Sequence, residues 1–286
     1  MSHLAGFHTA SNSYAITRVS RNLVPLLALY ALAPQLTDLS PGLAWVLTPV
    51  IGVLLYRLTM VMHDCGHGTL FTSRRTNVIV GKGLGYITGV DFDRFKERHW
   101  EHHRHYGAPR DPQGFHYHGT SALSRSAFAW HVLKPLLGLN VRYVFQESVL
   151  APRNLKKAAI TGELIALIGV QSGAALLITD GRHLSLAMIP FVAAVTFGLF
   201  LSQLRGMAEH GVRATEKDGA GFARSHSPDR IGQLLLYEVN FNYHEEHHRH
   251  PGIPSCRLPA LSRASRRGPT RGPRIWSTLT RMAADT

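Results

Sequence analysis

The sequence has 286 residues, of which 45% are hydrophobic and 17% are charged, whereas about 25% are charged in a typical soluble domain. Lys and Arg outnumber Asp and Glu by 31 to 18, and there are also 18 histidines. Two cysteines exclude a disulfide scaffold and a four-cysteine zinc site, and the long apolar runs exclude a disordered chain. The composition indicates a membrane protein with a basic, histidine-rich face.

Four apolar runs are candidates for membrane-spanning helices, which need about 20 apolar residues each. They are 23–39, 42–62, 160–179 and 184–204. The second run carries one charge, Arg57, and we expect this side chain to extend to the lipid headgroups. The first run is short and contains Pro25 and Pro34, so it either spans as a kinked helix or forms a re-entrant hairpin with the second run.

Short links join the first run to the second and the third to the fourth, so that each pair is predicted to be an antiparallel hairpin. The N-terminal segment and residues 63–159 and 205–286 then lie on one side of the membrane. Residues 63–159 hold 14 Lys and Arg residues and residues 205–286 hold 13, against only Arg182 in the opposite links. The positive-inside rule places them in the cytoplasm, and we expect a multi-pass protein of the inner or plasma membrane.

This topology divides the chain into a cytosolic segment 1–21, a membrane domain 22–261 and a basic tail 262–286. The tail is rich in Arg, Pro and Gly, and we expect it to be flexible and to lie on the membrane surface. An acidic electron-transfer partner docked on this tail is an open alternative. Nucleic-acid binding is disfavoured, because basic cytoplasmic segments are ordinary features of a membrane protein.

Three histidine clusters have helical spacing, and a ninth histidine, His210, follows the fourth run. The clusters are His63 and His67; His99, His102 and His103; and His244, His247 and His248. Residues at i, i+3 and i+4 lie on one face of a helix. Zinc sites usually stop at three or four ligands, so nine imidazoles suit two metal ions of higher coordination number. Carboxylates that could orient the rings from behind are Asp64, Glu101, Asp111, Glu209, Glu245 and Glu246.

Other histidines lie near these clusters and are candidates for lining the site, namely His105, His116, His118 and His250. Those farther away, including His131 and His226, are expected to be solvated or interfacial.

The clusters resemble the histidine boxes of the membrane-bound fatty acid desaturases, whose superfamily also includes lipid hydroxylases and carotenoid ketolases. The similar stretches are HDCGHGTLF at 63–71, HWEHHRHYG at 99–107 with Asp111-Pro112 after it, and NYHEEHHRHPGIP at 242–254. The resemblance covers roughly residues 20–261. It implies an all-α membrane protein with four transmembrane helices in two hairpins and a helical cytosolic cap, in which the nine histidines hold two iron ions.

Two positions depart from the family pattern. Some relatives have an Asn four residues before the lone histidine, where it reaches iron through water, but this chain has Gly206. That ligand is therefore absent or supplied differently. In the third box, Glu245 stands where many relatives have an apolar residue, and it is expected to alter the surroundings.

The resemblance implies a dioxygen-dependent desaturase that acts on a fatty acyl chain, free, carrier-bound or in a lipid. Trp100 and Tyr106 are expected to border the substrate channel. A separate electron donor of the ferredoxin, rubredoxin or cytochrome type is also implied. A lipid or carotenoid hydroxylase or ketolase is the first alternative. A metal-binding or metal-transporting membrane protein without redox chemistry is more remote, because the predicted spans hold charges only toward their ends.

Overall fold

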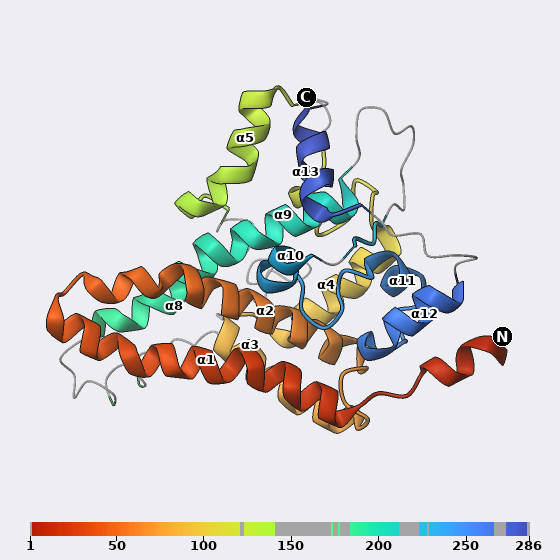
Figure 1. Ribbon diagram of the computed structural model, residues 1–286, viewed down its shortest axis with the longest axis horizontal. Helices are drawn as coiled ribbons and strands as arrows, with labels where there is room; N and C mark the ends of the chain where they lie inside the picture. Colours follow the sequence, from red (N-terminus) through yellow and green to blue (C-terminus); the bar gives the residue numbers. More distant parts are fainter. Residues whose placement is uncertain are drawn as a thin grey trace, which may run out of the picture.

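The structure is a computed structural model that describes residues 2–120, 123–140, 184–211, 223–227, 229–265 and 273–284, together with Gly173 and Leu177. Every regular element in these residues is helical, and none of them forms a strand (Figure 1). The longer helices are α1 Asn12–Leu39, α2 Thr48–His67, α3 Arg74–Thr88, α4 Phe92–His105, α5 Arg125–Leu133, α9 Leu199–His210 and α13 Ile275–Ala284. The shorter ones are α8 Met188–Ala193, α10 Arg230–Leu235, α11 His244–Arg249 and α12 Leu258–Ser265.

Two of the described segments are long and apolar enough to cross a membrane, Leu43–His67 and Ser185–His210. They correspond to the second and fourth predicted runs. The third predicted run, 160–179, lies outside the described residues except for Gly173 and Leu177. The two spans contact each other, because α2 packs against α8 and against the π-helical turn Ala194–Gly198 that leads into α9.

The first apolar run is part of α1, which lies antiparallel to α2 (Figure 1). The helix begins earlier than the run, at Asn12, where the Ser11 hydroxyl accepts a hydrogen bond from the backbone N–H of Tyr14. Pro25 and Pro34 both lie inside the helix. The apolar run is therefore the C-terminal part of a longer and more polar helix. α1 is not one of the two segments that are long and apolar enough to cross a membrane.

Replacing Gly52 by alanine should destabilise the contact between the two spans. A Cβ atom at position 52 would lie 2.6 Å from Cβ of Phe197 and 2.8 Å from the carbonyl oxygen of Ala193, so the helices would have to move apart. Overpacking of this kind costs about 1–3 kcal/mol, and we expect a lower melting temperature in detergent. Gly83→Ala is the control, because nothing lies within 4 Å of a Cβ atom at position 83. Equal melting temperatures for the two variants would contradict this packing.

The prediction that Arg57 extends to the headgroups is wrong. The residue is 3% exposed, and its guanidinium is paired with the buried carboxylate of Glu238. It also donates to the side-chain oxygen of Asn22 and to the carbonyl oxygens of Gln233 and Leu234. These acceptors lie far from α2 in sequence or on another helix, so the apolar run alone could not indicate them.

The expectation of a flexible tail over 262–286 is also wrong where the structure describes that segment. Residues 258–265 form α12, and α13 packs against α5 and α9. Ile275 and Met282 are buried, and Met282 forms an apolar cluster with Phe128 and Met207. Ile275, Thr278 and Met282 lie on one side of an amphipathic helix, whose pattern is hidden by the Arg-rich composition around it.

Candidate metal centre

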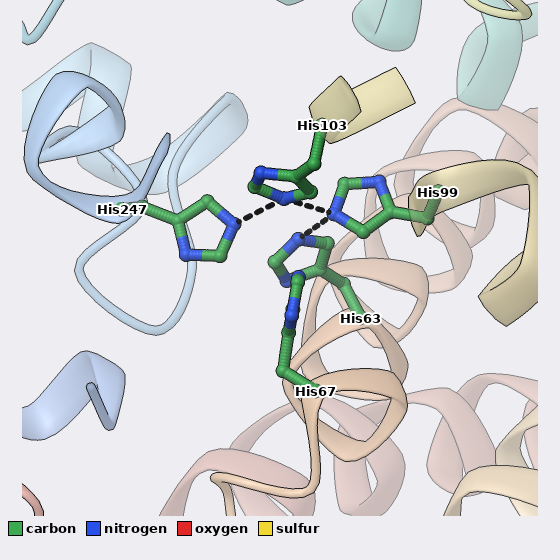
Figure 2. Close-up of side chains that lie close together, drawn as sticks. All are labelled: His63, His67, His99, His103 and His247. Carbon is green, nitrogen blue, oxygen red and sulfur yellow. Dashed lines mark hydrogen bonds between the residues drawn. The ribbon is translucent and has the colours of Figure 1, made fainter. Parts of the chain in front are cut away.

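Five of the predicted histidines come together in what we call group 1, at the end of α2 (Figure 2). Group 1 consists of His63, His67, His99, His103 and His247. One ring nitrogen from each lies within 4.8 Å of the corresponding nitrogens of the others. Three separate helices, α2, α4 and α11, supply these side chains.

The other four predicted histidines form group 2, in which every residue is buried. Group 2 consists of His102, His210, His244 and His248, and its ring nitrogens meet the same limit of 4.8 Å. The groups are neighbours, since the rings of His102 and His103 are 5.9 Å apart and those of His247 and His248 are 5.8 Å apart. All nine histidines singled out from the sequence therefore lie in two adjacent groups.

Helix geometry explains how adjacent residues reach different groups. Successive residues of an α-helix are about 100° apart around its axis. In α4, His103 therefore lies close to the direction of His99, in group 1, while His102 turns toward group 2. The same division separates His247 from His248 in α11. We expected each cluster to present its rings on one face; in the structure α4 and α11 each serve both groups.

Three of the four helices that carry these histidines, α2, α4 and α9, have an end that a particular residue defines. α2 stops just after His67, because Gly68 adopts the left-handed conformation at φ 71°. At the start of α4, the Asp91 carboxylate accepts a hydrogen bond of 3.0 Å from the N–H of Arg94. α9 ends at His210, where Gly211 leaves the helical conformation.

The ring nitrogens face one another at short range. The Nε2 atoms of His63 and His99 are 2.7 Å apart, and those of His210 and His244 are 2.8 Å apart. Burial, and then the neighbouring cationic forms of the other imidazoles, lower the pKa of His103 to about 2. The same two causes hold the pKa of His99 well below its ordinary value. The rings of His99 and His103 are therefore neutral at physiological pH, and each has a lone pair available.

The ring nitrogens of the two groups fit a bound cation. Among the described residues, both ring nitrogens of His67 and of His248 are buried without a hydrogen-bond partner. Buried polar atoms normally have partners, and convergent imidazole lone pairs are the donor set of iron, copper, nickel and zinc. Both groups therefore fit a metal ion held by nitrogen ligands.

Three of the six predicted carboxylates contact these rings. Asp64 Oδ1 is 3.1 Å from His63 Nδ1, and Asp111 Oδ1 is 2.9 Å from His102 Nδ1. In both pairs the Nδ1–H donates, which leaves Nε2 as the free acceptor. Glu209 Oε2 lies 3.4 Å from His244 Nε2 and 3.0 Å from Arg205 Nη1.

The other three carboxylates pair with side chains outside the two groups. Glu101 lies 3.6 Å from Arg98, and Glu245 lies 2.7 Å from Arg249 near the surface. Glu246 accepts a 2.6 Å hydrogen bond from Ser262, and another from Ser225. Glu101 and Glu245 thus pair within their own helices, α4 and α11, whereas Glu246 joins α11 to Ser225 and to Ser262 of α12.

The sequence matches the fatty acid desaturase family over residues 40–279. The chain belongs to this family. The match includes all nine histidines and continues past residue 261 into α13, so the first half of α13 falls within the family region.

Relatives of this desaturase-family protein include enzymes that are named for different activities. Sphingolipid delta(4)-desaturase DES1 of Bos taurus is 25% identical over 231 residues, covering 72% of this chain and 60% of the relative. Sphingolipid delta(4)-desaturase/C4-monooxygenase DES2 of Rattus norvegicus is 27% identical, covering 73% and 62%. Zeaxanthin 4-ketolase of Chlamydomonas reinhardtii is 26% identical, covering 73% and 42%. The chain thus spans about 60% of the length of the sphingolipid desaturases.

In this desaturase-family protein, the space beside Gly206 is filled by His116. A Cβ atom at position 206 would lie 2.9 Å from Cβ of His116. The His116 ring is buried, and its Nδ1 lies 3.1 Å from the amide oxygen of Gln203. Burial lowers the pKa of His116 to about 3, against the hydrogen bond with Gln203, which raises it. The ring is therefore neutral, and it occupies the place into which a longer side chain at 206 would extend.

Other aromatic side chains complete the walls of the two groups. Trp100 lies 4.8 Å from the His67 ring, and Tyr106 lies 4.5 Å from the His248 ring. Neither group includes His105, His118 or His250.

Two contributors were missed in the sequence. The Tyr117 hydroxyl donates to Asp111, and the Phe241 ring lies 4.6 Å from the His63 ring. Tyr117 follows Asp111 after a turn and the short 3-10 helix Gly114–His116, so the spacing of an α-helix or a strand could not indicate this contact.

The prediction of solvated surroundings is wrong for His226, which is buried and stacks on Tyr237. Its backbone N–H donates to the carbonyl oxygen of Asn242, and its own carbonyl oxygen accepts from the Asn242 side chain. This pairing holds the segment against the start of α11. His131 is half-buried and lies 3.0 Å from the carbonyl oxygen of His116.

Proposed function

We propose that this protein is an oxidoreductase that desaturates a fatty acyl chain with dioxygen, using two iron ions. The observation that carries the proposal is the pair of adjacent groups of imidazoles, one of them fully buried, in a chain of the desaturase family. Two neighbouring ions with many nitrogen ligands suit redox chemistry better than structural zinc, whose sites usually have three or four ligands.

Group 1 would hold one iron with five imidazoles, and group 2 would hold the other with four. When bound, the irons supply the activation of dioxygen that removal of hydrogen from an unactivated methylene requires. The chain itself contributes orientation: Asp64 and Asp111 each accept the Nδ1–H of a ring and thereby direct its Nε2 toward the metal. Burial of both groups keeps water away from the reacting carbon.

The proposed arrangement places this centre at the cytoplasmic boundary of the membrane. α2 and α9 belong to the two candidate spans, and each ends in a histidine of the centre, His67 and His210. An acyl chain could therefore approach from the bilayer, while a separate electron-transfer protein of the ferredoxin, rubredoxin or cytochrome type docks from the cytoplasm. Four spans in two hairpins under a helical cytosolic cap remain part of this proposal.

Hydroxylation or ketone formation on a lipid or carotenoid is the second candidate. It is favoured by the relatives named as a C4-monooxygenase and as a zeaxanthin 4-ketolase. Removal of a second hydrogen gives an alkene, whereas addition of oxygen gives an alcohol, so the same centre serves both outcomes.

Untargeted lipid mass spectrometry tests the proposal in a host that produces the wild-type protein or the His247→Ala variant. We expect a product two hydrogens lighter than its precursor, present with the wild type and absent with the variant. A product heavier by one oxygen would favour the second candidate. Purified wild-type protein that binds metal but yields neither product, when supplied with lipid extract, dioxygen and a chemical reductant, would favour a non-redox metal protein.

A further inference from the structure

A polar network outside the two histidine groups surrounds Glu238, whose side chain is fully buried. Its carboxylate pairs with Arg57 of α2, and with Arg18 at 3.1 Å and Arg21 at 3.5 Å, both of α1. Asn22 of α1 also donates to it, at 3.0 Å. One carboxylate thus joins both helices of the first hairpin to the segment that precedes the third histidine box.

Arg57 attaches that segment at a second place. Its Nη1 donates to the carbonyl oxygens of Gln233, at 2.7 Å, and Leu234, at 2.6 Å, in the last turn of α10. Its Nε donates to Asn22 at 2.7 Å. The guanidinium therefore contacts the chain both before and at Glu238, and it fixes the path of the chain between α10 and α11.

The turn that Glu238 opens has a backbone conformation that needs support. Val239 and Asn240 have φ values of 46° and 57°, and a β-branched residue at positive φ is strained. The Glu238 carboxylate accepts the N–H of Val239 at 3.2 Å, and its carbonyl oxygen accepts the N–H of Phe241 at 2.8 Å. Asn240 donates to the carbonyl oxygen of Ser255 at 3.0 Å. Such a conformation persists only where surrounding contacts enforce it, and Glu238 makes two of these contacts, with the N–H groups of Val239 and Phe241.

This turn leads directly into the third histidine box. Phe241 lies 5.1 Å from the His244 ring and 5.6 Å from the His247 ring. α11 has six residues, and its N-cap residue, Tyr243, makes no side-chain capping hydrogen bond. A helix this short does not hold itself in place, so the position of its three histidines depends on the segments that anchor it.

We propose that Glu238 is a positioning residue for the third histidine box: paired with Arg57, it holds the strained turn that sets the rings of α11 in both groups. The inference rests on the proposed function in so far as these rings bind iron. It assigns a role to the one charge inside the second apolar run, and it links the first membrane hairpin to the geometry of the centre.

The test compares purified Glu238→Gln with the wild type and with Asp93→Asn. Asp93 is a matched control, because its carboxylate pairs with Lys82 at the surface and is 59% exposed. Hydrogen–deuterium exchange of metal-free protein should be faster across residues 236–249 in Glu238→Gln, and unchanged in Asp93→Asn. Affinity for ferrous iron should fall by about 10-fold or more, with an altered Mössbauer spectrum of the iron that remains.

A double variant, Arg57→Met/Glu238→Met, separates positioning from folding. It removes the two buried charges together, while Arg18 and Arg21, whose side chains are 22% and 43% exposed, keep access to water. The melting temperature should therefore recover relative to Glu238→Gln. We expect exchange in α11 to stay fast and the spectrum to stay altered. Recovery of wild-type exchange and iron binding together with stability would overturn the proposal, as would wild-type exchange in Glu238→Gln itself. A wild type without iron affinity would refute the proposed function, while the exchange comparison would still decide whether Glu238 anchors α11.

Discussion

Replacing His247 by alanine should abolish product formation and lower the affinity of group 1 for iron. His248→Ala, one residue further along, should instead lower the affinity of group 2. The reason is the division of α11 between the two groups. Loss of a residue that only orients a ligand costs about 10–100-fold in metal affinity, so loss of a ligand should cost at least about 100-fold. Both variants should be inactive, because the proposed reaction needs both ions.

Iron analysis with Mössbauer spectroscopy distinguishes the two variants, because each should retain a different iron signal. His248→Ala should lose more iron than His247→Ala, because it leaves group 2 with three imidazoles, whereas His247→Ala leaves group 1 with four. His250→Ala is the control, because His250 follows the same helix and belongs to neither group. Identical spectra for His247→Ala and His248→Ala would contradict the assignment of their rings to separate ions.

Asp111→Asn should lower the affinity of group 2 for iron by about 10–100-fold, with a comparable loss of product. In the wild type, burial raises the pKa of Asp111, but hydrogen bonds from His102 and Tyr117 outweigh it and hold that pKa at about 2. The carboxylate is therefore ionised, and it keeps the His102 Nδ1 protonated. An asparagine side chain has no charge with which to stabilise that ring when it binds a cation.

Competition with a colorimetric ferrous chelator measures this affinity. Tyr117→Phe removes one hydrogen bond to Asp111 and leaves its charge, so its effect should have the same direction and a smaller size. Asp93→Asn is again the surface control. If Asp111→Asn bound two irons as tightly as the wild type, Asp111 would have no role in orienting His102.

The nine histidines could be predicted because their information is local. Spacings of three and four residues place the rings on one helical face whatever the tertiary structure, and the apolar runs before His63 and His210 indicate where two of the helices end. The division between groups could not be predicted, since it depends on how α4 and α11 are rotated relative to each other. A rotation of a few tens of degrees about either helix would change which group His102 or His248 joins.

The incorrect predictions concern residues whose partners are distant in sequence. Arg57 was assigned to lipid headgroups because it lies close to the end of an apolar run, whereas its partner Glu238 lies 181 residues later in the chain. Residues 275–284 were assigned to a flexible tail because Arg, Pro and Gly dominate the composition around them, although Ile275 and Met282 bury an apolar face. In both places the composition reflects residues that are adjacent in the sequence, whereas the packing depends on residues that are distant in the sequence and close in space.

The pairing of Arg57 with Glu238 has a consequence for the synthesis of the protein. A ribosome completes α2 long before Glu238 leaves the exit tunnel, so under the proposed topology the first hairpin enters the membrane with Arg57 lacking its carboxylate. An arginine at the centre of an inserting helix costs about 2.5–3.5 kcal/mol. Asn22, made 35 residues earlier, is the partner in this network that is already present to receive the guanidinium. The newly inserted hairpin is therefore an unfinished intermediate, which reaches its stable state only when the C-terminal third of the chain has been made and has folded back onto it.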